Sequence, residues 1–482
     1  MKKYFLATIL LWVASAIAAP SITPVAPKFI DGCYQIGTAA ELYGFAAITN
    51  GTDGMTRNTA ACGKLTADIV VNQNVLANDT LNGDGSNFVP WTPIEEFSGT
   101  FDGQFHTISG LYYSYKIDDQ EEHNWAAFIL SARPAREGDT VFIRNLGIED
   151  SYIFNYRYAA GILGSIDTGT IAMENVYYAS WVYGYYDTPA GLIGDANKGP
   201  LYVKNSYALV PEPMIRKVSL IEGAYSETRA QVVNCFGSSE LNLYTGTNER
   251  RMAYKEFLNG SVAVLLHTYP EGSIWGQNVG VDKHPVFSGK VTNYAGDRKI
   301  SKLTLHAESE HEPYPEIYME GMFTPLPIPP KEGHAFIGWY SNADFIGDTT
   351  MVISYKDTSD KEFFARWEPL PKLVDNCYQI GTVGELYGFA AIVNGTNGTP
   401  REQCACGKLT ADIIISDTLY RQGDRQLWFP MTDYCGTFDG NGKTISGLVY
   451  VKNKGANMGF FGSTRSFYFS YQESYSLRHN KT

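Results

Sequence analysis

The sequence predicts an all-β protein whose main body is a right-handed parallel β-helix, followed by a small β-grasp-like repeat and the start of a second, truncated β-helix. Two observations predict this class. Sequence markers recur about every thirty residues through the middle of the chain, and a long segment near the beginning is duplicated near the end. The composition agrees, because the 482 residues include 33 Tyr and 47 Gly, which favour strands and turns, while helical patterns are scarce.

The short period is marked by asparagine and by glycine. Ala160–Gly164 recurs thirty residues later as Ala190–Gly194, and four asparagines follow one another at intervals of 30, 30 and 29 residues: Asn145, Asn175, Asn205 and Asn234. A fixed period of this length indicates stacked supersecondary units. Units rich in Tyr, Val and Ile, with Gly at their corners, are β-coils. We therefore predict β-helix coils over residues 117–290.

The recurring asparagine has a physical role in this architecture. Stacked in successive coils, each side-chain amide is expected to bond its own turn and the Asn of the next coil, which satisfies buried polar groups along one corner. The alternative all-β architecture is a sandwich, which gives no reason for an Asn marker and a Gly marker to share one period. The best helical candidate in this region is Glu249–Leu258.

The duplicated segment spans residues 28–116 and recurs from residue 372. Glu41–Ile48 recurs unchanged as Glu385–Ile392, and Gly-Thr-Phe-Asp-Gly is followed in both copies by Thr-Ile-Ser-Gly-Leu. We expect each copy to open a β-helix. In the first copy we predict a short helix over 42–48, a strand over 65–71 and a tight turn at Phe101-Asp102-Gly103, with an equivalent turn at Phe438–Gly442. We interpret the Asp residues in these turns as turn formers, and metal binding is the alternative.

The glycine marker followed by Asn-x-Tyr resembles the GLUG motif of bacterial surface and secreted proteins, including some peptidases. This resemblance covers about residues 28–290 and continues from residue 372. It implies β-helix coils, and the duplicated Gly-Thr-Phe-Asp-Gly element resembles the opening of such arrays.

A second resemblance lies between the copies. Residues 273–289 read as a closing segment, and a new module with Phe336-Ile337-Gly338-Trp339-Tyr340 and Ala365-Arg366-Trp367 follows over residues 300–370. This pattern resembles the Listeria–Bacteroides repeat, the internalin-type B repeat. The resemblance implies a small β-grasp-like unit used as a spacer or interaction module on bacterial surfaces. We expect Trp339 and Trp367 to be core residues, and a ligand-facing role is the alternative.

Six of the seven cysteines suggest disulfide pairs. Cys33 and Cys62 are 29 residues apart, as are Cys377 and Cys406, and the two pairs occupy equivalent positions of the duplicated segment. Cys404 and Cys435 occur only in the second copy, so we expect them to pair with each other. Cys235 is predicted to be a buried thiol. Metal binding by Cys404-x-Cys406 is the alternative, although no His lies close in sequence to complete a tetrahedral set.

The first residues predict export. Residues 1–18 have the pattern of a signal peptide, with two lysines, an apolar run and a small-x-small cleavage site; an uncleaved anchor is the alternative. We therefore expect a secreted or cell-surface protein with no membrane insertion after cleavage. The net charge of −13 disfavours nucleic acid as a partner.

No catalytic motif is present, and we predict neither a catalytic residue, a cofactor nor a metal. The densest acidic cluster, Asp118–His123, is interpreted as a solvated loop, and a calcium site is the alternative. Aromatic residues crowd one coil, with Tyr152, Tyr156 and Tyr158 one coil earlier. We name a candidate ligand strip within that coil: Tyr178, Trp181, Tyr183 and Tyr185. The alternative is that these rings pack inside the coil or stack between coils.

These observations predict a non-catalytic repeat protein at the cell surface that adheres to a polysaccharide or a surface protein. A β-helix polysaccharide lyase or hydrolase is the alternative, and a structural spacer is the second alternative. The coil marker restarts at 459–462, so we expect residues 372–462 to hold the second copy and the first coil of a truncated β-helix. Residues 463–482 lose the period and are expected to form a disordered tail.

Overall fold

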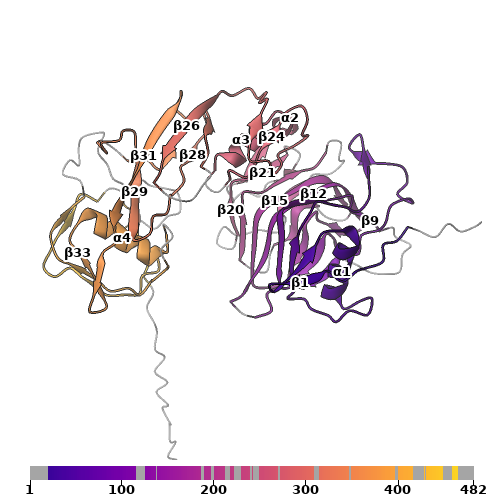
Figure 1. Cartoon of the computed structure of the whole chain (residues 1–482), viewed down its shortest axis with the longest axis horizontal. Coiled ribbons are helices and arrows are strands. Elements are labelled where there is room, and N and C mark those ends of the chain that lie inside the picture. Colours follow the sequence, from indigo (N-terminus) through magenta and orange to yellow (C-terminus); the bar gives the residue numbers. More distant parts are fainter. Residues whose placement is uncertain are drawn as a thin grey trace, which may run out of the picture. The chain divides into compact units, whose positions relative to one another are not determined.

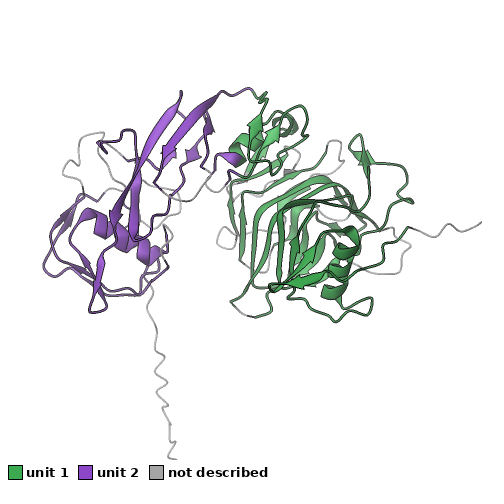
Figure 2. Ribbon diagram, viewed as in Figure 1, with its two compact units in different colours: residues 1–266, 274–296 green, residues 267–273, 297–482 purple. Residues whose placement is uncertain are grey.

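The computed structural model describes residues 20–115, 125–136, 138–185, 189–196, 200–211, 218–221, 230–238, 241–242, 249–269, 272–308, 314–346, 349–396, 400–415, 428, 430–448 and 459–464. Strands dominate and helices are few, which confirms the all-β class (Figure 1). The chain divides into two compact units (Figure 2). Unit 1 comprises residues 1–266 and 274–296, and unit 2 comprises residues 267–273 and 297–482. The predicted signal peptide, residues 1–18, lies outside the described residues, as does the predicted tail beyond residue 464.

Unit 1 opens with a hairpin and a helix. The helix α1 (Ala39–Asn50) contains the predicted 42–48 segment. It begins where the Thr38 hydroxyl accepts a hydrogen bond from the Glu41 backbone N–H (3.2 Å), and it ends at Gly51, whose φ of 76° suits glycine. The short strands of this opening are β1 (Lys28–Ile30), β2 (Cys33–Ile36), β3 (Cys62–Leu65), β4 (Ile69–Val70), β5 (Leu76–Ala77) and β6 (Thr80–Leu81).

The larger sheet of unit 1 is almost entirely parallel. Its strands are hydrogen-bonded in the order β1-β2-β3-β8-β12-β15-β18-β21-β23, with β4, β9, β17 and β20 pairing beside them. Among the described strands of this sheet, only β1 and β2 pair antiparallel. The bounds are β8 (Thr100–Ser109), β9 (Tyr112–Ser114), β12 (Thr140–Asn155), β15 (Thr170–Gly184), β17 (Leu201–Lys204), β18 (Tyr207–Leu209), β20 (Ala230–Val233), β21 (Cys235–Ser238) and β23 (Glu249–Met252).

A smaller parallel sheet runs through the same part of the chain, in the order β22-β19-β16-β14-β11-β7. Its strands are β7 (Ile94–Phe97), β11 (Ile129–Ala132), β14 (Leu163–Ile166), β16 (Ala190–Asp195), β19 (Val218–Ile221) and β22 (Leu241–Asn242). Along the chain these strands alternate with those of the larger sheet. A third pairing joins β10 (Trp125–Ala126) to β13 (Tyr158–Ala159). Each stretch of about thirty residues therefore adds one layer to both sheets.

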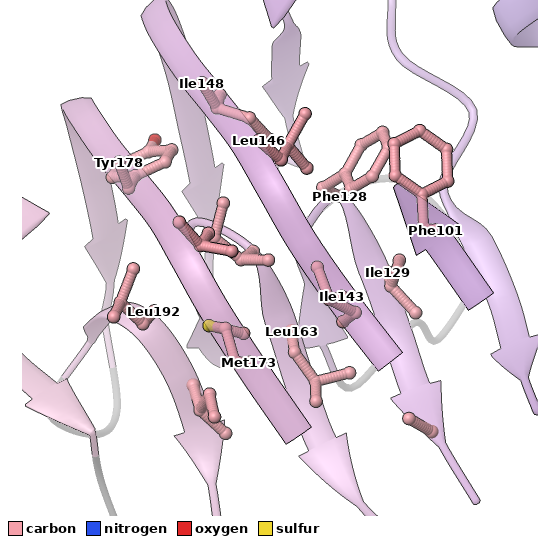
Figure 3. Packing of buried hydrophobic residues seen from close by; sticks show 14 of the residues in the cluster. Phe101, Phe128, Ile129, Ile143, Leu146, Ile148, Leu163, Met173, Tyr178 and Leu192 are labelled. Carbon is pink, nitrogen blue, oxygen red and sulfur yellow. The ribbon is translucent and has the colours of Figure 1, made fainter. Parts of the chain in front are cut away.

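The strand register has the spacing of the sequence markers. Thr140 pairs with Thr170, and Ile171 pairs with Leu201, so neighbouring strands join residues thirty positions apart. Inward-facing side chains of both sheets meet in one buried core, which includes Ile143, Leu163 and Leu192 (Figure 3). Burial of this apolar surface is the main stabilising contribution to the layers.

The marker asparagines lie at one corner with φ between 48° and 53°, a left-handed conformation that Asn tolerates better than most residues. Asn175 donates to Asn145 (3.0 Å), and Asn234 donates to Asn205 (2.9 Å). Between Asn175 and Asn205 the ladder is interrupted. The buried Asn175 Oδ1 and Asn205 Nδ2 atoms have no hydrogen-bond partner among the described residues, and Val176 N–H instead donates to the Ser206 hydroxyl (3.0 Å).

Three sequence-based expectations for the elements of unit 1 are wrong. The strand predicted over 65–71 is interrupted, because β3 ends at Leu65 and the next strand, β4, covers only Ile69–Val70. Phe101-Asp102-Gly103 is not a turn between strands but lies inside β8, because β12 pairs along both halves of that strand. Residues 249–258 are not one helix either. They form β23 and then α2 (Tyr254–Leu258), because residues 249–252 pair with β21. The unit continues with α3 (Ser261–His267), β24 (Gln277–Asn278) and β25 (Val291–Thr292).

Unit 2 begins with a small mixed sheet in the order β27-β26-β31-β29. Trp339 is fully buried in its core and donates through its indole N–H to Pro327 O (2.8 Å). Trp367 packs against that core and donates to Pro329 O (3.1 Å). The strands are β26 (Ile300–His306), β27 (Ile317–Met319), β28 (Thr324–Pro325), β29 (His334–Tyr340), β30 (Val352–Ile353) and β31 (Lys361–Pro369). Both tryptophans therefore contribute to a small core, as expected.

The rest of unit 2 repeats the opening of unit 1. Its elements are β32 (Lys372–Val374), β33 (Cys377–Ile380), α4 (Val383–Asn394), β34 (Gly407–Leu409), β35 (Ile413–Ile414), β36 (Phe438–Asp439) and β37 (Ile445–Ser446). Tyr378 pairs with Gly407 as Tyr34 pairs with Gly63. The duplication in sequence is thus a duplication in structure.

All three predicted disulfides form: Cys33–Cys62, Cys377–Cys406 and Cys404–Cys435. Cys235 is a buried free thiol, as expected. Because disulfides persist in oxidising compartments, the three bonds indicate an extracellular or periplasmic location.

Candidate binding surface

Aromatic residues at the ends of β12 and β15, and just beyond them, form pairs on the outer side of the larger sheet. Tyr152 stacks on Trp181 with ring centroids 4.2 Å apart, Phe154 stacks on Tyr183 at 5.8 Å, and Tyr156 stacks on Tyr185 at 4.8 Å. The two rings of every pair are within 11° of parallel. We call these six residues the aromatic strip. Strand alternation and the parallel register bring them together, since each pair joins equivalent positions of neighbouring layers.

The strip is accessible and uncharged. Tyr185 is 43% exposed, and the other five rings are partly exposed. Burial, and to a smaller degree the neighbouring Tyr112, raises the pKa of Tyr152 to about 12, so this phenol stays protonated at neutral pH. Stacking holds the rings in fixed positions, which lowers the conformational entropy that a ligand must remove on binding.

Tyr178 does not belong to this surface, and its assignment to the candidate strip is wrong. On β15 the even-numbered side chains point inward from Val176 onward, so Tyr178 is out of phase with Trp181, Tyr183 and Tyr185. It is fully buried beside the core residues Ile148 and Leu192 (Figure 3). Its hydroxyl donates to the backbone O of Trp181 (2.7 Å).

Of the three tyrosines named one repeat earlier, Tyr152 and Tyr156 belong to the strip. Tyr158 instead stacks on Trp125, with ring centroids 4.9 Å apart. The alternative reading of the aromatic residues, stacking between coils, is therefore also realised. The strip combines both features, because its rings stack on one another and remain partly exposed.

The sequence analysis missed a polar network beneath the closing segment 273–289. Tyr177 and Tyr207 lie thirty residues apart, face outward and are nevertheless fully buried, because Trp275 and His284 cover them. The Tyr177 hydroxyl donates to Glu149 Oε2 (3.1 Å), which lies 3.4 Å from His284 Nε2. The Tyr207 hydroxyl lies 2.9 Å from His284 Nδ1.

The carboxylate of this network stays ionised. Burial alone would raise the pKa of Glu149, but the hydrogen bond and charge of His284 and the hydrogen bond from Tyr177 outweigh it, and the pKa is lowered. The phenol pKa of Tyr177 is raised far above its ordinary value by burial and then by the Glu149 charge. The Glu149 carboxylate therefore stays ionised and the Tyr177 phenol stays protonated near neutral pH, which suits fixed hydrogen bonding between them.

Metal binding is the alternative role for the aspartates of the predicted turns and for the Asp118–His123 cluster. Asp102 is buried and accepts hydrogen bonds from Arg144 Nε (2.9 Å), Asn145 Nδ2 (3.0 Å) and Gln104 N–H (3.0 Å), so the protein itself occupies its oxygens. The Asp118–His123 cluster lies outside the described residues. Within the residues that the structure describes, no three His, Cys, Asp or Glu side chains are grouped to hold a metal ion. None of the helices in this described part combines the length and the apolar character needed to cross a membrane.

The fold and surface define an all-β protein of an oxidising compartment, with a partly exposed aromatic strip on parallel strands. No family model matches the chain, and no curated protein sequence matches it. One solved structure similar to part of it is a candidate immunoglobulin A1 protease from Bacteroides ovatus, at 14% identity and a TM-score of 0.28. The match covers 53% of this chain and 92% of that one, and at this TM-score it supports no argument.

Proposed function

We propose that the protein is a secreted or cell-surface, non-catalytic repeat protein that binds a neutral polysaccharide through the aromatic strip. In this proposal unit 1 is a right-handed parallel β-helix with GLUG-type coils. The small mixed sheet of unit 2 is an internalin-type B repeat, and the second copy opens another β-helix. Alternation of the chain between two parallel sheets and the thirty-residue register support the β-helix.

The observation that carries the proposal is the three stacked ring pairs on one outer face of β12 and β15. Partly exposed aromatic rings held in fixed positions are unusual on a surface that has no ligand to bind. Tyr and Trp combine a large apolar area with a polar group, so they suit ligands that carry both C–H faces and hydroxyl groups, as sugars do.

The charge of the chain favours a neutral ligand. The net charge is −13, with 51 acidic residues against 38 basic ones, so an anionic polysaccharide would be repelled over most of the surface. A surface protein as the partner is the competing identity for the ligand. The regular spacing of the pairs along two strands favours a chain of repeating units over a globular partner.

The hydrolase alternative needs a carboxyl group that can donate a proton, and this requires a raised pKa, whereas a lyase needs a base such as Lys or Arg beside bound calcium. Glu149 has the opposite shift, and the neighbouring Asp150 carboxylate accepts hydrogen bonds from two backbone N–H groups, those of Val75 (3.2 Å) and Leu76 (2.9 Å). These contacts favour binding over catalysis. A purely structural spacer would bind no glycan.

The test is a glycan array followed by titration calorimetry with the neutral polysaccharide that binds best. The triple variant W181A/Y183A/Y185A removes the rings of β15 and its continuation, and we expect it to lower the affinity at least about a hundredfold, since hot-spot aromatic residues contribute about 2 kcal/mol or more. The control is Phe142→Ala, which removes a ring that is 40% exposed elsewhere on β12.

Equal loss of affinity in the control and in the triple variant would contradict a role for the strip. Breakdown of the polysaccharide during the titration, measured as new chain ends, would favour the enzyme alternative. Absence of binding to every glycan, with capture of a surface protein that depends on the strip, would favour a protein partner.

A further inference from the structure

Unit 1 contains a cleft of about 760 Å³ that the sequence analysis did not anticipate. One side is the β5–β6 hairpin, and its lining includes Asn78 and Asp79. The other side includes Tyr254 of α2 and Asp282 and Lys283 of the closing segment. Glu149 and Asp150 of β12 line it as well. The volume lies in the range of small-molecule sites, which is about 300–1,000 Å³.

The β5–β6 hairpin is fixed in place at the cleft. Its two-residue turn consists of Asn78 and Asp79, with φ of 50° and 62°, and such turns favour Asn followed by Gly. Asp79 therefore occupies a position where glycine would be more stable. The Asp150 carboxylate accepts from Val75 and Leu76 N–H, which ties the hairpin to β12.

The opposite wall supplies both donors and acceptors. The Tyr254 hydroxyl donates to Asp79 Oδ2 across the cleft at 3.4 Å, a long hydrogen bond that a ligand hydroxyl can replace at little cost. Asp282 is oriented by the Asn278 N–H, which donates to it (2.6 Å), and Lys283 is exposed. Apolar side chains of Leu76, Leu209 and Leu258 also line the cleft. Converging polar groups beside an apolar wall are the usual features of a sugar site.

The cleft and the aromatic strip follow one another on the same two strands. Ala179 lines the cleft and precedes Trp181 by two residues on β15, and Asp150 precedes Tyr152 by two residues on β12. Between the pairs Glu149–Ala179 and Tyr152–Trp181, β12 has one residue more than β15, and Asp150 lies at this bulge. An extended ligand that leaves the cleft along β12 and β15 therefore meets the first stacked pair.

We propose that this cleft binds one or two sugar units of a neutral glycan, whose following units lie on the aromatic strip. The inference rests on the proposed function and adds a polar site that determines which sugar is accepted. The carboxylates of Asp79, Asp150 and Asp282 accept hydrogen bonds from sugar hydroxyls, Lys283 and Tyr254 donate them, and the surplus of negative charge rejects sugars with acidic groups.

The test uses the full chain with two probe sets, neutral disaccharides and neutral pentasaccharides built from glucose, mannose, galactose or N-acetylglucosamine. The variant Asp79→Gly removes the carboxylate and places in the turn the residue that the turn favours, so the hairpin is retained. Tyr254→Phe removes the opposing hydroxyl. The matched control is Asp53→Gly, which makes the same change at another left-handed Asp, φ 53°, that does not line the cleft.

We expect Asp79→Gly and Tyr254→Phe each to weaken disaccharide binding about tenfold or more, since each loses a hydrogen-bonding partner of the sugar, while Asp53→Gly leaves it unchanged. Trp181→Ala is expected to weaken only pentasaccharide binding. Loss of disaccharide binding in Asp79→Gly together with no effect of Trp181→Ala on the pentasaccharide would support the cleft and refute the strip.

Unchanged binding of both probe sets by Asp79→Gly and Tyr254→Phe, with loss of pentasaccharide binding in Trp181→Ala, would overturn the cleft proposal and leave the proposed function standing. Absence of binding of any probe to the unaltered chain would also overturn it.

Discussion

The two copies of the duplicated segment share their elements but are stabilised in different ways. Both copies have the equivalent backbone hydrogen bond, from Ser98 N–H to Thr59 O (2.8 Å) and from Cys435 N–H to Gln403 O (3.0 Å). In the first copy the Ser98 hydroxyl also donates to the Thr59 hydroxyl (2.9 Å). In the second copy the disulfide Cys404–Cys435 joins the same two stretches of chain. The first copy continues into β12, whereas the described residues that follow the second copy contribute only isolated bridges near Phe461 and Thr464.

A pair of equivalent aspartates shows the consequence. Asp102 of the first copy has 2% of its side chain exposed and is bound by Arg144 and Asn145 of β12. Asp439 of the second copy has 49% of its side chain exposed and lies 3.8 Å from Lys408 Nζ. The same local sequence thus forms the same strands in both copies, but the neighbouring strand decides whether the carboxylate is buried.

The largest effect is expected from removing this bond. Cys404→Ser with Cys435→Ser opens a loop of 31 residues, and we expect the second copy to lose about 4 kcal/mol of unfolding free energy by the loop-entropy estimate. Hydrogen exchange of β34 and β36 under urea measures the loss.

The reciprocal variant, Ala60→Cys with Ser98→Cys, is expected to form a fourth disulfide in the first copy. Failure to form this bond would contradict the structural equivalence of the two copies.

Asp102→Ala is expected to have the next largest effect, about 2 kcal/mol, because the partly buried Asn145 amide loses its acceptor, while Arg144 is 45% exposed and can be hydrated. The matched change in the second copy, Asp439→Ala, is expected to cost less than about 1 kcal/mol, because an exposed ion pair contributes little. Urea denaturation followed by hydrogen exchange of β8 and β36 compares the two. Equal losses would show that the neighbouring strand is not what distinguishes the copies.

Acid is expected to act on β12, the strand that pairs with the first copy. The folded pKa of Glu149 is lowered, so its stabilising contribution is present above its unfolded pKa of about 4.3 and is lost as pH falls through the folded value. We expect Glu149→Gln to cost about 1 kcal/mol at pH 7 and to cost progressively less below pH 4. Thermal unfolding of both proteins from pH 3 to 7 checks this. A difference that is constant with pH would contradict it.

The smallest effect is expected at the bend of β8. Gln104 and Phe105 have φ of 50° and 64°, where the second copy has Asn441 and Gly442, which tolerate this conformation better. Replacing them by Asn and Gly relieves about 1 kcal/mol of strain but removes the contact of Phe105 with Phe287, at 5.6 Å between ring centroids. We expect a net change in stability below about 1 kcal/mol. Gln104→Asn alone separates the two contributions, because it eases the backbone at residue 104 and keeps the ring contact between Phe105 and Phe287.

The local features of the fold were predictable from sequence because each depends on a short pattern. Equivalent cysteine positions predicted the disulfides, the asparagine period predicted the register, and the apolar spacing of residues 42–48 predicted α1. The turn expected at Phe101–Gly103 failed because it depends on a strand forty residues further along the chain.

The candidate site was predictable only in part for the same reason. Alternation along one strand places Trp181, Tyr183 and Tyr185 on the outer face, and the same alternation applied strictly excludes Tyr178. Periodicity also aligns Tyr177 with Tyr207, but it cannot reveal that residues 273–289 return to cover both. The cleft is formed by three segments that are distant in sequence, so no local pattern marks it.

The interruption of the asparagine ladder has a mechanical consequence. Between Asn175 and Asn205 two buried amide atoms lack partners, and beside the unbroken β15 the neighbouring layer is split into β17 and β18. In a stack where each layer contacts only its neighbours, rupture starts at the weakest junction. We therefore expect a chain that is pulled from both ends to unfold first at the boundary between the layers of Asn175 and Asn205. The layers that carry the aromatic strip are expected to stay folded at that force.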